Sequence, residues 1–447
     1  VFREDELSCP SRRRQGVHVS GTAASSESPA WSALDLARRA GLAYLPTPEQ
    51  VAVVEAPLEP LLVVAGAGSG KTETMAARVV WLVENQLVRP EEVLGLTFTR
   101  KAAAELAERI ELRLRALRGD RTDPAGGVGP DRPRIATYNA YAAGLVRDHG
   151  LRIGIDPETQ LLGEAGRWQL ATRVVERWAG ELSTDAAPST VVTAVLDLAG
   201  ALAEHLLTPA VAASEIHALA RALVDKDDAP AGPRRGPRAR VRQFVESLEA
   251  RAELMDNVEA FVRRKRELGV LDFADQVALA CRIARQIPDV GASERASYRV
   301  VLLDEYQDTS VAQVAMLSAL FGGGHPVSAV GDPHQAIYGW RGASASSVER
   351  FPETFACADG RPATIATLST SWRNDRAILT AANSLAGPLR SPTGGPGRRR
   401  APRAPVSLPV LEARPRAGAG RVTAFYAETA DAAVSYTHLR AHETYIT

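Results

Sequence analysis

The stretch that decides the fold is Val63-Val64-Ala65-Gly66-Ala67-Gly68-Ser69-Gly70-Lys71-Thr72. Apolar residues lead into a loop of small residues that ends in Gly-Lys-Thr, as in the P-loop pattern, with Ala65 at the first glycine position. Backbone N–H groups of such a loop and the following helix N-terminus bind phosphate oxygens. We expect Lys71 to reach the β- and γ-phosphates and Thr72 to ligate Mg²⁺. A dinucleotide-binding loop is excluded, because Lys71 stands where its third glycine is required.

The composition of the 447-residue chain fits a globular protein of two to four domains, with 45% hydrophobic residues. No run of 18 apolar residues and no signal pattern occurs, so we expect no membrane segment and a cytoplasmic location. Cys9, Cys281 and Cys357 are odd in number and far apart, which favours neither disulfides nor a metal cluster. The 53 basic residues balance 53 acidic ones, so any nucleic-acid contact must be local.

Two adjacent carboxylates, Asp304 and Glu305, follow the apolar run Val300 to Leu303. Such a run predicts a buried parallel strand with the carboxylates at its C-terminal tip. Beside a P-loop, Asp304 is expected to bind Mg²⁺, and Glu305 to orient and deprotonate the attacking water. Gln335 follows another apolar run, 327–330, and is expected to sense a γ-phosphate.

Aromatic, hydroxyl and basic residues also follow predicted strands at 93–98, 135–137 and 327–330. Rings on which bases stack, together with phosphate-binding groups, suit single-stranded nucleic acid. Taken alone, the first cluster is explained better by Phe98 in the core and a solvated Lys101. The seven candidates for DNA contacts are Thr97, Phe98, Lys101, Tyr138, Tyr338, Trp340 and Arg341.

The pattern between about 150 and 265 is helical, with helices expected at 168–182, 191–207, 212–223 and 241–268. Apolar, strand-like segments lie on both sides of this region. The sequence therefore predicts an α/β protein in which a helical insertion interrupts a parallel-sheet domain.

In this order, the segments resemble the UvrD/Rep/PcrA family of superfamily 1 DNA helicases over roughly residues 44–390. The joint order of the motifs carries the resemblance: Gln50, 65–72, 97–106, 137–141, 271–275, 304–308, 331–343 and 368–374. The resemblance implies a RecA-like motor domain, a helical insertion and the start of a second RecA-like domain. The implied units are a leader and helix at 1–43, motor parts at 44–150 and 269–355, the insertion at 151–268, and the incomplete beginning of the second motor domain at 356–433.

The resemblance also implies roles for single residues, with ATP and Mg²⁺ as cofactors. Gln50 would read the adenine, although Thr47 to Gln50 also predicts an ordinary helix cap. Trp372 would stack on the adenine in place of the family's tyrosine, and Arg373 would contact the γ-phosphate. The implied catalytic set is Lys71, Asp304, Glu305, Gln335 and Arg373.

The function implied is ATP-dependent 3′–5′ translocation on single-stranded DNA and separation of duplex DNA, in repair or recombination. Residues 65–80 and 92–104 resemble most an actinobacterial AdnB-type helicase-nuclease subunit, which implies a heterodimer partner. Two alternatives stay open: a P-loop ATPase that switches protein partners, and a helicase-like scaffold subunit without catalysis.

The C-terminal tail departs from the resemblance. The family's later motifs are not recognisable after Asn374, and residues 434–444 can be back-translated into a sequence similar to a transposase sequencing adapter. We expect 434–447 to be an artefact and His438 with His442 to bind no metal. The chain is then C-terminally truncated, and we expect it to hydrolyse ATP poorly.

Overall fold

The centre of the protein is a six-stranded sheet in which every pair of neighbouring strands is parallel. The computed structural model describes residues 30–118, 132–156, 158–180, 186–227, 238–339, 342–344, 346–390, 406 and 408–423. The sheet has the order β3-β2-β6-β7-β1-β8. Its strands are β1 (Leu61–Ala65), β2 (Val93–Thr97), β3 (Arg134–Thr137), β6 (Val300–Leu303), β7 (Val327–Gly331) and β8 (Thr364–Leu368). The predicted α/β fold is confirmed.

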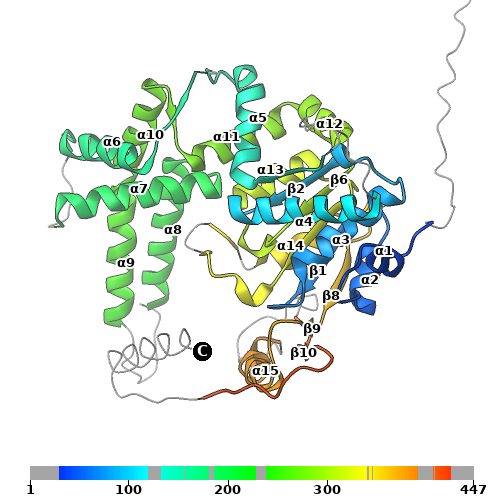
Figure 1. The fold of residues 1–447 in the computed structure, drawn as a ribbon. Coiled ribbons are helices and arrows are strands. Elements are labelled where there is room, and N and C mark those ends of the chain that lie inside the picture. The colour runs from blue at the N-terminus through cyan, green and yellow to red at the C-terminus, as the bar shows by residue number, and fades with distance from the viewer. Residues whose placement is uncertain are drawn as a thin grey trace, which may run out of the picture.

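Helices cover both faces of this sheet (Figure 1), because its inner strands are apolar on both sides. Leu62 and Val64 face one core and Leu61 and Val63 the other. One face packs against α5 (Tyr138–His149), α11 (Phe273–Gln286), α12 (Pro288–Ser297), α13 (Val311–Phe321) and α14 (Ser346–Thr354). The other packs against α1 (Ala33–Arg39), α2 (Pro48–Val54), α3 (Lys71–Glu84) and α4 (Arg100–Arg118). The result is a three-layer α/β/α unit.

The predicted helical insertion forms a separate packed group, to the left of the sheet in Figure 1. It contains α6 (Glu164–Glu176), α7 (Pro188–His205), α8 (Pro209–Asp227), α9 (Arg238–Glu253) and α10 (Met255–Glu267). The single helix expected at 241–268 is two helices, α9 and α10, separated at Leu254. The short strands β4 (Gln160–Leu161) and β5 (Val270–Leu271) pair where the chain enters and leaves this group.

Short 3-10 helices connect several of these elements: η1 (Pro90–Glu92), η2 (Gly150–Ile153), η3 (Tyr306–Asp308) and η4 (Pro333–Gln335). Within the described residues, no single helix is long and apolar enough to cross a membrane. By length and composition, α7 and α8 pass such a test only as a pair, bent by 98° at the break between them.

The boundary predicted between residues 355 and 356 needs correction. Strand β8 lies beyond that boundary, yet it pairs with β1 along its whole length, from Leu61 with Thr364 to Ala65 with Leu368. Its β-branched residues favour a strand, and its pairing with β1 places it at the edge of the first sheet. After it come β9 (Thr370–Ser371), α15 (Arg376–Arg390) and β10 (Glu412–Ala413), with β9 paired to β10. That these elements begin a second motor domain stays a prediction.

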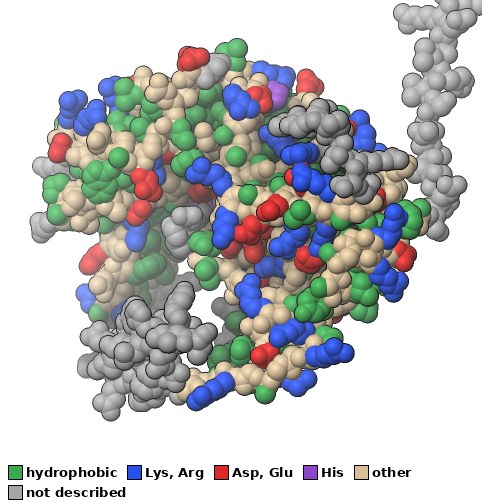
Figure 2. Space-filling model, viewed as in Figure 1, with side chains coloured by type: hydrophobic (Ala, Val, Ile, Leu, Met, Phe, Trp, Pro, Cys, Tyr) green, Lys and Arg blue, Asp and Glu red, His purple; other side chains and the backbone are tan. Residues whose placement is uncertain are grey.

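Figure 2 shows that basic and acidic side chains are interspersed over the face in view. The charge balance of the sequence is therefore also local on this face. Any preference for a polyanion there has to come from a few placed residues rather than from a broad basic surface.

Candidate functional site

The P-loop joins the buried strand β1 to the start of α3, and its glycines adopt conformations that few other residues take. Gly68 and Gly70 have φ of 75° and 82°, and Gly70 caps α3. A Cβ at Gly68 would lie 2.6 Å from the Cβ of Arg373, and one at Gly70 would lie 2.8 Å from Nε2 of Gln50. Larger residues would therefore strain the loop and collide with its neighbours.

Lys71, the first residue of α3, is ion-paired across the site with the predicted water-activating carboxylate. Its Nζ lies 2.9 Å from Oε2 of Glu305, which directly follows the tip of β6. Asp304 is buried beside it, and its Oδ1 accepts a hydrogen bond from the backbone N of Glu305. The structure thus brings the P-loop lysine and both predicted carboxylates together.

Burial and the neighbouring charge of Glu305 raise the pKa of Asp304 to about 6, partly offset by Lys71. The same two causes raise the pKa of Asp308 to about 6. Its Oδ1 is buried without a hydrogen-bond partner among the described residues. This cluster of carboxylates therefore carries more negative charge than Lys71 balances, which favours a divalent cation.

Glu305 has φ of 48° and ψ of 44°, the left-handed conformation that residues with a Cβ adopt rarely. A backbone held there costs about 1–3 kcal/mol and persists only where its surroundings enforce it. This conformation follows directly on Asp304 and carries the Glu305 carboxylate to Lys71.

A chain of hydrogen bonds connects the carboxylates to Gln335 on η4. Gln307 donates through Nε2 to Oε2 of Glu305 at 2.9 Å, and its Oε1 accepts from the backbone N of Asp332 at 3.0 Å. The Oδ2 of Asp332 accepts in turn from Nε2 of Gln335 at 2.6 Å. Gln335 thus contacts the site through Asp332 and Gln307, while its side chain is itself exposed.

The segment after β8 closes over the P-loop. The backbone N of Trp372 donates to the carbonyl O of Gly68 at 2.8 Å, and Oγ of Ser371 donates to Ala67 at 3.2 Å. Glu49 of α2 holds the same segment by accepting from N and Oγ of Ser369, both at 2.7 Å. Arg373 is exposed at the mouth of the loop, beside Gly68.

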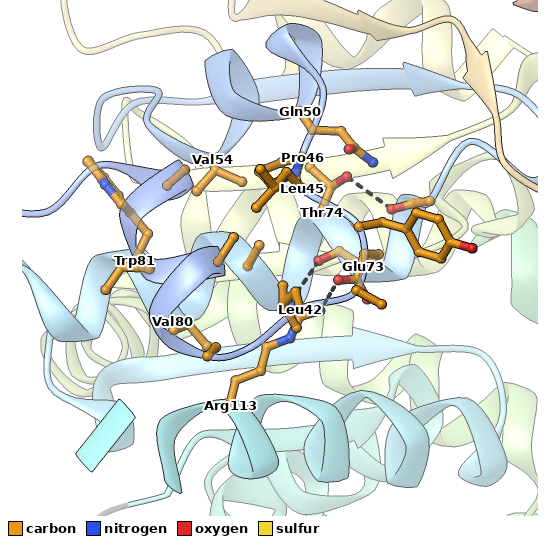
Figure 3. A pocket seen from close by; sticks show the side chains of 18 of the residues that line it. Leu42, Leu45, Pro46, Gln50, Val54, Glu73, Thr74, Val80, Trp81 and Arg113 are labelled. Atoms are coloured by element: carbon orange, nitrogen blue, oxygen red, sulfur yellow. Dashed lines mark hydrogen bonds and ion pairs between the residues drawn. The ribbon is translucent and has the colours of Figure 1, made fainter. Parts of the chain in front are cut away.

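A cavity of about 620 Å³ opens beside the loop, between α1, α2 and α3. Gln50, Gly70 and Trp372 lie at its P-loop end together with Tyr44, whose ring centroid is 5.4 Å from that of Trp372. Figure 3 shows Gln50 at one side and the ion pair of Glu73 with Arg113 at another. Apart from Thr74 and Arg414, apolar side chains line the rest, which suits an aromatic base.

Gln50 forms the predicted helix cap and also lies beside the P-loop, while its role in reading adenine stays a prediction. Thr47 and Gln50 form a reciprocal capping box at the start of α2, in which Oε1 of Gln50 accepts from the backbone N of Thr47. Its Nε2 lies 3.4 Å from the carbonyl O of Ser69, so the side chain also borders the P-loop and the cavity.

The residues present fit Mg-ATP. The left-handed glycines form a cradle that larger side chains would fill, and the surplus carboxylate charge suits Mg²⁺. In the described part of the chain no group of three or more His, Cys, Asp or Glu residues could hold a metal ion. Thr72 and Asp304 would therefore bind Mg²⁺ only together with phosphate oxygens and water, as is usual for this ion.

The predicted DNA-contact residues fall into three groups. Lys101 and Tyr338 are exposed, and Phe98 is half-buried with its ring 5.0 Å from that of Tyr138. Thr97 and Tyr138 are each only 1% exposed, so the prediction that they touch DNA is corrected: their side chains belong to the interior. Trp340 and Arg341 lie outside the described residues.

The sequence of this chain matches a known protein family. A family model described as UvrD/REP helicase N-terminal domain matches residues 46–356, more than half of the chain. The chain belongs to this family. It is 27% identical over 331 residues to DNA helicase II of Rickettsia typhi, covering 73% of this chain and 42% of that protein.

Two further relatives give the same result. ATP-dependent DNA helicase PcrA of Leuconostoc citreum is 27% identical over 340 residues, with 75% of this chain and 38% of that protein covered. DNA helicase II of Escherichia coli is 28% identical over 338 residues, with 75% and 39% covered. The chain thus spans about two fifths of the length of these relatives.

Several residues that shape the site of this UvrD/REP family member have no role predicted from the sequence. Gln307 and Asp308 lie within the motif 304–308, and Asp332 directly follows β7, where parallel sheets place ligands. This position at a strand tip could have indicated Asp332 as a site residue. Nothing in the sequence could reveal that Glu49 holds Ser369, 320 residues away.

Proposed function

We propose that this chain is the nucleotide-binding motor part of a DNA helicase that hydrolyses ATP to move 3′ to 5′ along single-stranded DNA and separate duplex DNA, in repair or recombination. The observation that carries the proposal is the set of contacts from Lys71 through Glu305, Gln307 and Asp332 to Gln335 beside a complete P-loop. The direction of movement rests on the family resemblance.

Three residues of this set, Lys71, Glu305 and Gln335, have defined roles in the proposal. When bound, Mg-ATP supplies the phosphoryl group that is transferred to water. Lys71 leaves Glu305 to neutralise phosphate charge, which frees the Glu305 carboxylate to accept a proton from that water. In this proposal Gln335 and Arg373 sense the γ-phosphate, and Phe98, Lys101 and Tyr338 contact the DNA strand.

Replacement of the P-loop lysine tests the proposal. We expect the chain to show slow ATPase activity that single-stranded DNA stimulates, and Lys71→Ala to lower its kcat by roughly 10²-fold or more, because one preorganised charge on the reacting group is lost. Arg38→Ala, on the exposed surface of α1, is the control and should leave kcat unchanged.

Two results would contradict this function. Turnover that is indifferent to added single-stranded DNA would favour the ATPase switch on protein partners. Equal activity of the wild-type protein and Lys71→Ala would favour the scaffold subunit, since such a subunit needs no phosphate-binding lysine.

We also propose that residues 1–447 alone hydrolyse ATP slowly. Arg373 is the only arginine that the resemblance assigns to the γ-phosphate within this sequence, and a second such charge is worth about 10³–10⁵ in rate. Rapid DNA-stimulated turnover by this chain would disprove the statement.

The finer assignment is an AdnB-like subunit that works in the cytoplasm as a heterodimer with a helicase-nuclease partner. This assignment is supported by the amino-acid sequence of residues 65–80 and 92–104. Sequencing of the reading frame beyond residue 433 tests it: a second motor domain followed by a nuclease would support it, and a stop codon or an unrelated domain would count against it.

A further inference from the structure

We propose that Tyr138 is a positioning residue for the ATPase reaction, and that it acts by holding the peptide between Asp304 and Glu305 in place. The inference rests on the proposed function for its catalytic meaning. Its structural part can be tested without turnover.

The contact that carries the inference lies in the interior. The hydroxyl of Tyr138 donates a hydrogen bond to the carbonyl O of Asp304, at 3.0 Å. Tyr138 is 1% exposed, and Asp304 is 7% exposed. A buried carbonyl that loses its donor cannot turn to water, so this bond fixes the orientation of the peptide that follows Asp304.

The next residue explains why that orientation needs support. Glu305 begins at this same peptide and has the left-handed φ of 48°. In that conformation its carboxylate reaches Nζ of Lys71 at 2.9 Å and Nε2 of Gln307 at 2.9 Å. Rotation of the 304–305 peptide toward the relaxed right-handed region would move the carboxylate away from both.

Tyr138 is itself held in position from two sides. It is the first residue of α5, which Thr137 caps by accepting from the backbone N of Ala140. Its ring packs 5.0 Å from that of Phe98, which follows β2. The hydroxyl therefore connects the segment proposed to contact DNA with the backbone of the carboxylate pair.

The test compares two buried tyrosines of the same helix. Tyr138→Phe removes only the hydroxyl that reaches Asp304. Tyr141→Phe is the matched control: Tyr141 is likewise 1% exposed, and the variant removes a hydroxyl that donates to Oε2 of Glu294 at 2.6 Å in a partly buried contact. Both variants keep their rings, so each loses one hydroxyl and its hydrogen bond.

We expect Tyr138→Phe to raise the amide hydrogen-exchange rate of peptides covering 300–310 by about tenfold, and Tyr141→Phe to leave those peptides unchanged. In ATPase assays we expect Tyr138→Phe to lower kcat about tenfold with the KM for ATP within twofold, because positioning of Glu305 rather than nucleotide binding is lost. Tyr141→Phe should leave both constants unchanged.

The inference is overturned if exchange at 300–310 is unchanged in Tyr138→Phe, or if it rises equally in both variants. It is also overturned if exchange rises as expected while kcat stays at the wild-type value. Absence of ATP hydrolysis in the wild-type protein would instead remove the proposed function, and the exchange comparison would still decide whether Tyr138 holds the 304–305 peptide.

Discussion

At the scale of the residue, the centre of the site consists of side chains whose chemistry allows few substitutes. Lys71, Asp304 and Glu305 lie together where the P-loop meets the tip of β6, and their residue types and their positions after apolar runs predict this arrangement. Aromatic residues were harder to place. An aromatic ring that follows a strand can either stack on DNA bases or pack in the core. Only the fold shows that Tyr138 is buried.

His325 gives a prediction at this scale. Burial is the main cause that lowers the pKa of His325 from 6.5 to about 4, with a backbone hydrogen bond to Tyr298 opposing the shift and the charge of Arg295 adding to it. The folded protein therefore keeps a neutral imidazole, whereas the unfolded chain binds a proton below pH 6.5. Stability should fall as the pH drops from about 6.5 toward 4, by about 1–2 kcal/mol after allowance for partial exposure.

Urea unfolding of the wild-type protein and His325→Gln across this pH range measures the effect. The variant should lose that part of the pH dependence, and His205→Gln, at an exposed histidine, should keep it. Identical pH profiles for His325→Gln and the wild-type protein would contradict the prediction.

At the scale of the element, α3 contains a buried arginine, Arg78, that the periodic pattern of the helix does not predict. Arg78 lies in a helix whose other buried residues are mostly apolar, and a sequence pattern places an arginine in solvent. In the structure it is fully buried, and its guanidinium donates to the carbonyl O atoms of Val53, Val54, Ala56 and Pro57. It thereby provides hydrogen-bond donors to the backbone carbonyls at the C-terminal end of α2. No local sequence pattern could show this contact.

Arg78→Met should therefore be costly although methionine suits an apolar site. It would leave those four carbonyls and the hydroxyl of Ser328, which accepts from Nε at 3.1 Å, without their donor. We expect a loss of roughly 3 kcal/mol or more in the free energy of unfolding, measured with urea. Arg38→Met, at an exposed arginine of α1, should change it by less than about 0.5 kcal/mol. Similar losses in both variants would refute this role.

At the scale of the whole molecule, the sequence predicted that a helical insertion interrupts the sheet but not how the two are joined. Lys265 of α10 is 3% exposed and lies 2.9 Å from Asp272 and 2.6 Å from Asp275, at the start of α11. Arg167 of α6 approaches Asp272 at 3.3 Å. Charged residues usually predict surface, so a buried ionic junction is invisible to pattern reasoning.

Lys265→Met tests this junction. Removal of the lysine leaves the buried Asp272 with Arg167 alone and the partly buried Asp275 without a cationic partner, and we expect a loss of about 3 kcal/mol in unfolding free energy. Arg263→Met, at an exposed residue of the same helix, is the control. Limited proteolysis should show faster cleavage between α10 and α11 in Lys265→Met. Unchanged cleavage and unchanged stability would mean that the junction contributes nothing.

The pairing of β8 with β1 also sets a rule for how chain length can vary among relatives. Leu368 pairs with Ala65, and four residues later the N–H of Trp372 bonds to Gly68. Both ends of this connection are fixed to the P-loop, so one inserted residue would shift Arg373 by about 3.3 Å. In an alignment of related chains, the number of residues between positions 368 and 372 should therefore be constant.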